Sequence, residues 1–437
     1  MTKRLALLCA LGLAALAALA GTSAATAASR DEIVINCQEC EASATDVFAQ
    51  SWNDTVQAFN AKYKGKYRVN VQHYGGGTND LPYWQRLAIA GRLPDIFIIQ
   101  STELATIAKT GKLFNLASDL SKDKTWKNSF YPDVFAGLSG SQGQIWAIPE
   151  ERDTVGIYYN KVLFSKAGIS AFPRTWDEFL ADCAKLKAAG VIPFAMDGDW
   201  VTQLMWANLI GTQPGGEQFL NKGIRSGGYA KKAFVVKATE FLKSLHTSGY
   251  VNKDAFTGDY TNAANPFLQE QAAMIANGPW MVQADIKGKS AKAGLYSQVG
   301  YALSPGWKPT GQGAIILAGN GGVASGTSDP TKQQAVIAFL KFATSTAIQL
   351  NRTIKTGAYP GVQLKLSKAQ IKRLEPLTYR LVKTAEAAKY EFPHAKFATP
   401  QAFTDAWKNY WPGYVQGSMT TQDFLGKLSK AVTTAGS

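Results

Sequence analysis

Short apolar segments alternate with amphipathic helices at the start of this chain, and this alternation limits the folds open to it. Residues 33–36, 67–71 and 93–99 are predicted strands, because their apolar residues alternate or run together. Residues 48–63 carry apolar side chains at helical spacing, so Trp52 is predicted to face a core, and residues 83–90 are a second predicted helix. The order strand, helix, strand, helix, strand predicts a parallel sheet covered by helices, an α/β fold.

The same pattern continues through the middle of the chain. Residues 156–159 form a predicted strand, and Thr175 with Glu178 has the spacing of a capping box that begins a helix. Cys183 lies on the apolar face of that helix, which predicts a small core residue. Later, Asp329 is the predicted N-cap of a further helix, because a proline follows it at the first helical position.

The first residues have the order of a secretory signal peptide. A cationic start is followed by the apolar stretch 5–20 and then by small residues, so we expect residues 1–28 to be removed after Ala27 or Ala28. An uncleaved membrane anchor is the alternative. Cys9 lies too early and Cys37 too late for a lipid-modified cysteine at the cleavage site. We therefore expect an exported, soluble, periplasmic protein.

The roughly 409 residues that remain are long for one core, so two domains are expected. In an open parallel sheet, ligands bind where loops leave the carboxyl ends of the strands. Two such lobes that face each other would enclose a cleft, a favoured place for a small ligand. The pattern alone predicts a binding cleft without naming its ligand.

Charge and cysteine content narrow the possible partners. The net charge is +14, or +12 without the signal peptide, but it comes mostly from scattered lysines, which argues against nucleic-acid binding. The charge would either steer an acidic ligand or serve solubility alone. Export makes a Cys37–Cys40 disulfide the expected state of that pair, with a redox site as the alternative. With only three histidines in the chain, we expect no metal and no cofactor.

Several sequence blocks, taken together and in order, resemble the extracellular solute-binding proteins of carbohydrate ABC importers, the maltose-binding-protein-like family. The two more specific blocks run from the Tyr-Asn-Lys at 159–161 to the Thr-Trp-Asp-Glu-Phe at 175–179, and from the Ala-Ala-Met at 272–274 to the Gly-Pro-Trp at 278–280. The others lie at 93–97, 111–116, 143–149, 321–324 and 357–360. The resemblance covers nearly the whole mature chain.

This resemblance implies a two-lobed periplasmic-binding-protein fold of type II, with a mostly parallel sheet in each lobe and the ligand cleft between the lobes. The implied lobes comprise 33–150 plus 320–358, and 155–315 plus 364–437, with crossings near 149–155, 315–320 and 358–364. The implied function is capture of a sugar or oligosaccharide by hinge closure and delivery to the membrane permease of an ABC importer. We expect a monomer that binds no nucleic acid and catalyses no reaction.

The resemblance also indicates site residues. An acid and an aromatic residue line the cleft of the family where this chain has Asp199 and Trp200, and Trp280 is expected to stack on a sugar face. Asp153 stands where the family places an acid. The alternatives are that Asp199 or Asp197 only caps a helix, that Trp280 is a core residue, and that Asp153 belongs to a solvated charge cluster.

Further candidates follow from their position at strand ends. Gln100, Ser101 and Thr102 follow a predicted strand, and the glycines after Asn320, beginning with Gly321, would let backbone approach a ligand. The remaining candidates are Trp146 near the first crossing, Trp407 and Trp411 as a stacking face, and Gln38 or Glu39 after the first strand.

Two other functions stay open at this point. A secreted glycoside hydrolase or lyase would use paired carboxylates, for which Glu150, Glu151 and Asp153 are candidates. A binding protein of the same fold would alternatively take a polyamine, an iron complex or a phosphorylated solute. An acidic sugar such as a uronate also remains open because of the basic charge.

Overall fold

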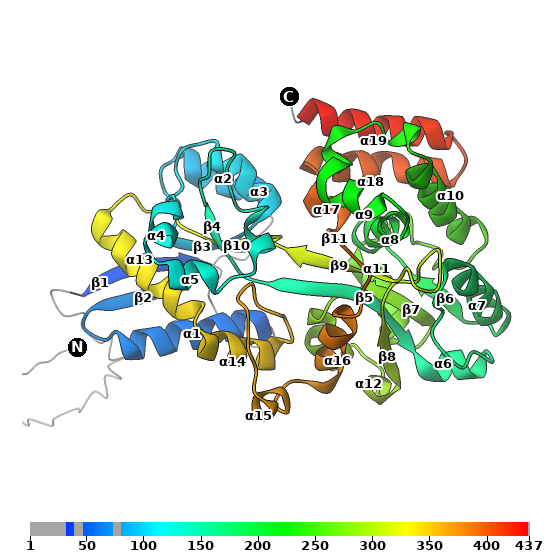
Figure 1. Ribbon diagram of the computed structural model, residues 1–437, viewed down its shortest axis with the longest axis horizontal. Helices are drawn as coiled ribbons and strands as arrows, with labels where there is room; N and C mark the ends of the chain where they lie inside the picture. The colour runs from blue at the N-terminus through cyan, green and yellow to red at the C-terminus, as the bar shows by residue number, and fades with distance from the viewer. Residues whose placement is uncertain (1–31, 39–46, 73–79, 436–437) are drawn as a thin grey trace, which may run out of the picture.

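The computed structural model describes residues 32–38, 47–72 and 80–435, and these form two lobes side by side (Figure 1). The expected signal peptide, Cys9, Glu39 and Cys40 lie outside the described residues. Each lobe is built around its own β-sheet with helices packed on both faces. Within the described residues no helix is both long and apolar enough to span a bilayer.

The first lobe contains a five-stranded sheet with the strand order β2-β1-β3-β10-β4. Its strands are β1 (Ile33–Gln38), β2 (Tyr67–Gln72), β3 (Ile96–Gln100), β4 (Ala147–Pro149) and β10 (Gly321–Ala324). Its helices are α1 (Val47–Lys62), α2 (Leu81–Ile89), α3 (Ser101–Ala108), α4 (Ala117–Lys122), α5 (Lys124–Asn128), the 3-10 turn η1 (Pro132–Phe135), α13 (Pro330–Ala343) and α14 (Thr346–Thr356).

Strand β3 shows why its sequence is a continuous apolar run. Ile96 and Ile98 pack in one core cluster with α1 and α13, whereas Phe97 and Ile99 pack in another with α2 and α3. Successive side chains of a strand point to opposite faces, so a strand covered on both faces needs apolar residues at every position.

The second lobe contains a six-stranded sheet with the order β11-β9-β5-β7-β6, and β8 pairs with β5. Its strands are β5 (Arg152–Asn160), β6 (Ile192–Ala195), β7 (Ala272–Asn277), β8 (Val299–Ala302), β9 (Gly313–Ala318) and β11 (Tyr390–Phe392). Its longer helices are α7 (Trp176–Ala188), α8 (Trp200–Gly211), α10 (Ala233–Thr247), α11 (Tyr260–Leu268), α16 (Pro376–Ala385), α18 (Gln401–Val415) and α19 (Thr421–Ala435).

The shorter helices of this lobe fill its connections. They are α6 (Lys161–Lys166), α9 (Gly216–Gln218), η2 (Phe219–Gly223), η3 (Ile224–Ser226), η4 (Tyr229–Lys231), η5 (Val282–Ile286), α12 (Leu295–Gln298), α15 (Lys368–Ile371) and α17 (Ala395–Ala398). Helix α8 runs through the middle of the lobe, and all of its residues from Val201 to Gly211 are buried.

Each sheet contains one strand that runs against the others, β10 in the first lobe and β5 in the second. These are the two strands that arrive directly from the other lobe. A chain that leaves one sheet at its carboxyl edge and enters the facing sheet there must run in the reverse direction. The predicted fold, two lobes with mostly parallel sheets, is confirmed.

The chain passes between the sheets at residues 150–151, between β4 and β5, and at residues 319–320, between β9 and β10. The third crossing is expected near 358–364, and Val362, Leu364 and Leu366 pack against the first core. Leu377 is the next residue to pack in the core of the second lobe. We therefore propose that the third crossing lies after residue 366.

Candidate functional site

A pocket of about 350 Å³ lies where the carboxyl ends of β3, β7 and β9 meet between the lobes. We call it the tryptophan pocket. It is lined by Phe48, Ala49, Trp52, Ile98, Ile99, Gln100, Glu150, Glu151, Trp280, Asn320 and Gly321. Four of the expected site residues therefore come together here: Gln100, Trp280, Asn320 and Gly321.

Trp280 reaches this pocket from a rigid turn after β7. The Asn277 side chain accepts a hydrogen bond from the backbone N–H of Gly278 at 2.9 Å, and the Tyr158 hydroxyl donates to the Gly278 carbonyl at 2.9 Å. A Cβ at Gly278 would lie 2.1 Å from the indole ring of Trp280. Glycine is thus the residue that lets the indole fold back over the turn, where it stays half-buried.

Another part of the pocket lining is held by a largely shielded ion pair between Glu150 and Arg352. Glu150 Oε1 accepts hydrogen bonds from Trp52 Nε1 at 2.7 Å and from Arg352 Nη2 at 3.1 Å. The Arg352 guanidinium also lies 3.9 Å from the centre of the Trp52 ring. These contacts fix the Glu150 carboxylate and the indole of Trp52 at the floor of the pocket.

Asp153 lies just behind this floor, at the start of β5, and is almost completely buried. It accepts a hydrogen bond from the backbone N–H of Tyr359 at 2.6 Å. Burial raises the pKa of Asp153 to about 7, against the lowering effect of the Tyr359 bond. Burial, together with the charges of Asp153 and Glu150, also raises the pKa of Glu151 well above its usual range. The carboxyls of Glu151 and Asp153 therefore form one interacting pair.

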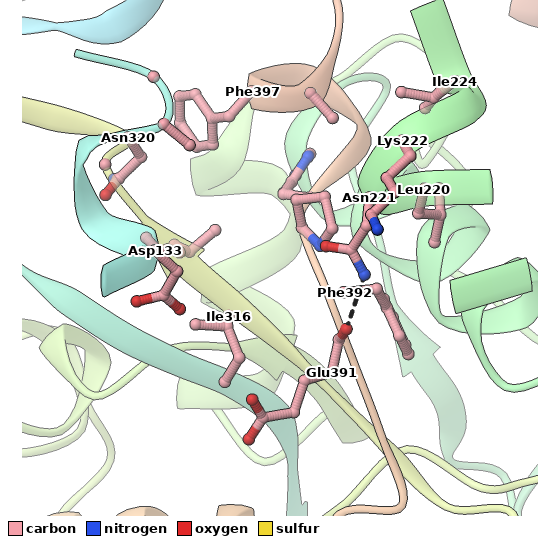
Figure 2. Close-up of a pocket in the computed structure, with 18 of the residues that line it drawn as sticks. Asp133, Leu220, Asn221, Lys222, Ile224, Ile316, Asn320, Glu391, Phe392 and Phe397 are labelled. Carbon is pink, nitrogen blue, oxygen red and sulfur yellow. Dashed lines mark hydrogen bonds between the residues drawn. The ribbon is translucent and has the colours of Figure 1, made fainter. Parts of the chain in front are cut away.

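A second pocket, of about 420 Å³, is also lined by Asn320 (Figure 2). We call it the histidine pocket. It is lined by Asp133, Ala136, Gly137, Leu220, Asn221, Lys222, Ile224, Arg225, Ile316, Leu317, Ala318, Gly319, Asn320, Glu391, Phe392, Pro393, His394, Phe397 and Ala398. It shares with the tryptophan pocket only Asn320 among the described residues.

Polar groups around the histidine pocket are largely paired with one another. Arg152 forms ion pairs with Asp133 of the first lobe at 2.9 Å and with Glu391 of the second at 3.4 Å. Asn221 donates to the Glu391 carbonyl at 3.0 Å, the bond drawn in Figure 2. Arg152 therefore ties the two lobes together beside this pocket.

His394 is held as a neutral ring. Its Nδ1 accepts from the backbone N–H of Lys396 at 2.9 Å, so Nε2 carries the proton and donates to the Trp200 carbonyl at 3.1 Å. Burial lowers the pKa of His394 to about 3. The Trp200 indole stacks on this ring at 4.3 Å between centres and lies 6.1 Å from that of Trp280. Trp200 thus bridges the two pockets.

Comparison with known proteins identifies the family. The family model for the bacterial extracellular solute-binding proteins matches residues 43–350. The chain belongs to this family. The match spans both lobes and includes every residue that lines the tryptophan pocket.

Solute-binding proteins of known name are similar to it. A multiple sugar-binding protein of Streptococcus mutans is 27% identical over 303 residues, which cover 66% of this chain and 67% of that protein. The diacetylchitobiose-binding protein DasA of Streptomyces coelicolor is 27% identical over 323 residues, 70% of this chain and 69% of that protein. For a xylose/arabinose-binding protein of Haloferax volcanii, at 24% identity, the match covers 56% of this chain and about half of that protein, 51%.

Solved structures share the fold of this solute-binding protein. A chitin oligosaccharide binding protein superposes with a TM-score of 0.75 at 23% identity, covering 93% of this chain and 99% of the other. A maltose-bound MalE3 of T. maritima gives a TM-score of 0.71 at 20% identity, covering 92% of this chain and all of the other.

Other expected site residues of this solute-binding protein lie beside the pockets. Asp199 precedes α8 and contacts Lys408 at 2.9 Å and Gln203 at 2.6 Å. Asp197 is the residue that caps α8, because it accepts from the backbone N–H of Val201 at 2.8 Å. Ser101 is buried, and its N–H donates to the Asn320 carbonyl at 2.9 Å.

Three other residues expected at the site, Trp407, Trp146 and Gln38, line neither pocket. Trp407 is fully buried in the second core, stacked on the equally buried Trp411 at 4.9 Å, and so presents no face to a ligand. Trp407 lies on the apolar face of α18, and the helical periodicity of that face places it in the core and not in the cleft. Trp146 packs against the cluster around Leu138 and lines neither pocket. Gln38 is buried and donates to the Tyr83 hydroxyl.

Cys37 is disulfide-bonded and Cys183 is free and buried. Cys40 lies outside the described residues, so the Cys37–Cys40 pairing stays a prediction. The buried position of Cys183 agrees with its predicted place in the core.

Sequence reasoning missed Trp52 as a pocket residue, since its helical spacing indicates only a core position. Trp52 is in fact both a core residue and a pocket residue, because it is only 3% exposed and packs in the first core but also lines the pocket. No signal in the sequence joins Trp52 to Glu150 and Arg352, because those residues lie 98 and 300 positions further along the chain.

Proposed function

We propose that this protein binds a sugar or oligosaccharide between its two lobes, outside the cytoplasm, and delivers it to an ABC importer. The observation that carries the proposal is the tryptophan pocket, which gathers the half-buried indole of Trp280, amides and carboxyl groups from both lobes and from the crossings. The sugar-related names of several relatives support the choice of ligand.

The pocket suits the two chemical needs of a sugar. The C–H faces of a pyranose need a flat apolar surface, which Trp280 would supply. Its hydroxyls need donors and acceptors in fixed positions, which the amides of Gln100 and Asn320 and the carboxyl of Glu151 would supply. Trp200 and Asp199 would extend the site along the second lobe, and Asp153 would hold Glu151 in place.

Hinge closure would couple binding to delivery. The lobes are joined by short crossings, and the pocket takes Trp280 from one lobe and Gln100 from the other. A ligand bound to one lobe gains the second set of contacts only when the cleft closes, and this difference in affinity shifts the open–closed equilibrium. We propose that the closed, loaded form docks on the permease as a monomer, after removal of residues 1–28, with no cofactor and no catalysis.

A thermal-shift screen of the mature protein tests this function. The panel contains neutral mono- and oligosaccharides, amino sugars, uronates, polyamines, phosphorylated solutes and iron complexes. A ligand that binds only the folded state adds about 2.7 kcal/mol to the free energy of unfolding at a hundredfold excess over Kd. This added stability raises the melting temperature. We expect shifts with saccharides, and shifts with non-sugars alone would refute the sugar assignment. The protein is unfolded and refolded before the screen, so that a retained ligand does not mask binding.

A further inference from the structure

Glu150 occupies the first crossing between the lobes and lines the tryptophan pocket. Its backbone N–H donates to the Gly321 carbonyl at 3.4 Å, and its carbonyl accepts from the N–H of Gly361 at 3.4 Å. Two other segments of the chain therefore hold its backbone, so its side chain starts from a fixed point.

The two oxygens of the Glu150 carboxylate have different surroundings. Oε1 accepts hydrogen bonds from Trp52 Nε1 at 2.7 Å and from Arg352 Nη2 at 3.1 Å. Oε2 accepts none from the described residues but is not enclosed either, since the side chain is 17% exposed. Because Glu150 lines the pocket, Oε2 is the oxygen that a ligand there can reach.

Arg352 holds this carboxylate from helix α14. Its guanidinium is 8% exposed and lies 3.9 Å from the centre of the Trp52 ring, and its Nη1 is buried without a hydrogen-bond partner among the described residues. An ion pair removed from water contributes little more to stability than apolar residues of the same size, and often less. Stability alone therefore does not explain why a charged pair stands at the edge of the pocket.

The two neighbouring carboxyl groups are in a different state. Burial raises the pKa of Glu151 well above its usual range and that of Asp153 to about 7. Among the described residues, only Glu150 of the three forms an ion pair. A carboxylate accepts hydrogen bonds and cannot donate them, and such charge-assisted bonds are the stronger kind. Glu150 therefore offers the pocket an acceptor in a fixed position.

We propose that Glu150 determines the specificity of the tryptophan pocket, because its Oε2 accepts a hydrogen bond from one particular hydroxyl of the saccharide, and that Arg352 is the positioning residue that keeps this oxygen in place. The inference rests on the proposed function, which supplies the saccharide. It adds that the ligand must carry a hydrogen-bond donor at one ring position, whatever its net charge.

Isothermal titration calorimetry at pH 7 tests the proposal with modified sugars. The probe is the disaccharide among maltose, cellobiose and diacetylchitobiose that binds most tightly or, if none binds, the tightest saccharide of the thermal-shift screen. It is compared with its monodeoxy and monodeoxyfluoro analogues, neither of which can donate at the altered position. We expect one position where each replacement weakens binding by about tenfold or more, and we call this loss the deoxy penalty.

A double variant shows whether Glu150 is the acceptor. Glu150→Leu combined with Arg352→Met removes both partners of the ion pair and leaves neither charge unpaired. We expect it to reduce the deoxy penalty to within about twofold. If its melting temperature shows that it does not fold, Glu150→Gln takes its place. Its amide offers N–H donors where the carboxylate only accepts, so the penalty should fall by about threefold or more.

Single variants on α14 test the positioning role. Arg352→Met should reduce the deoxy penalty to within about threefold, and Arg352→Lys, which keeps a cation but loses the planar fork, should restore part of it. Lys355→Met is the matched control, because Lys355 also joins α14 to α1, through Asp54 at 2.6 Å, and neither residue lines the pocket. It should keep the wild-type penalty. A merely structural arginine would lower the melting temperature without changing the penalty.

The outcomes separate this inference from the function beneath it. The absence of any such ring position in the wild type, or an unchanged penalty without the Glu150 carboxylate, overturns the role of Glu150 and leaves sugar binding intact. A penalty that persists in Arg352→Met, or that Lys355→Met also abolishes, overturns the positioning role of Arg352. If no saccharide binds at all, the proposed function itself fails.

Discussion

At the scale of single residues, Trp146 is a suitable control for Trp280. Both indoles are half-buried, but only that of Trp280 lines the tryptophan pocket. We expect Trp280→Ala to weaken sugar binding by about tenfold or more, because a ring stacked on a sugar contributes more than 1 kcal/mol. Trp146→Ala should leave the affinity unchanged. Calorimetric titration of both variants checks this, and an equal loss of affinity in the two would contradict a specific role of Trp280 in binding.

Asp153 predicts a pH dependence of stability. A buried acid with a raised pKa binds more protons in the folded than in the unfolded state between about pH 4 and pH 7, so its contribution to stability falls as the pH rises. Asparagine at this position does not titrate. The unfolding free energy of the wild type minus that of Asp153→Asn should therefore decrease from pH 4.5 to pH 7 and level off above. Urea unfolding of both proteins across this range measures it, and an increasing difference would contradict the raised pKa.

At the scale of elements, helix α7 begins with a complete capping box. Thr175 accepts from the backbone N–H of Glu178 at 3.2 Å, and Glu178 accepts from the backbone N–H of Thr175 at 3.2 Å. Thr175→Ala should lower the free energy of unfolding by about 1 kcal/mol, because it leaves an amide of the first turn unsatisfied. Thr175→Ser keeps the acceptor and should remain near the wild type. Urea denaturation followed by far-UV circular dichroism measures both, and equal losses would mean that the cap contributes nothing.

At the scale of the whole molecule, the two lobes are expected to approach each other on ligand binding. Small-angle X-ray scattering should show a smaller radius of gyration with a saturating sugar than without it, because closure brings the lobes together around Asn320. Trp280→Ala at the same sugar concentration should show a reduced change. A radius of gyration that stays constant at saturation would refute hinge closure, even if calorimetry confirms binding.

The sequence by itself determined the secondary structure and the class of fold. The capping box of α7, the Asp329 N-cap of α13 and the doubly covered strand β3 all lie where local pattern predicts them. These features depend on residues a few positions apart, and helix and strand periodicity records such neighbours directly. Gln100 and Asn320 were found in the same way, because the position after a strand or before a glycine pair is itself a local feature, whereas Trp280 was indicated by the resemblance to the family.

Only the tertiary structure decided how distant residues combine. Trp407 has the same residue type as Trp280, yet core packing buries the first completely, and the turn after β7 leaves the second half-buried in the lining of the tryptophan pocket. The grouping of Trp52, Glu150 and Arg352, and the burial of Asp153 behind Glu151, join segments up to 300 residues apart. The pairing of Glu150 with Arg352 and the raised pKa values of Glu151 and Asp153 follow from these long-range contacts, and for that physical reason the net charge of the sequence does not give the charge of the pocket.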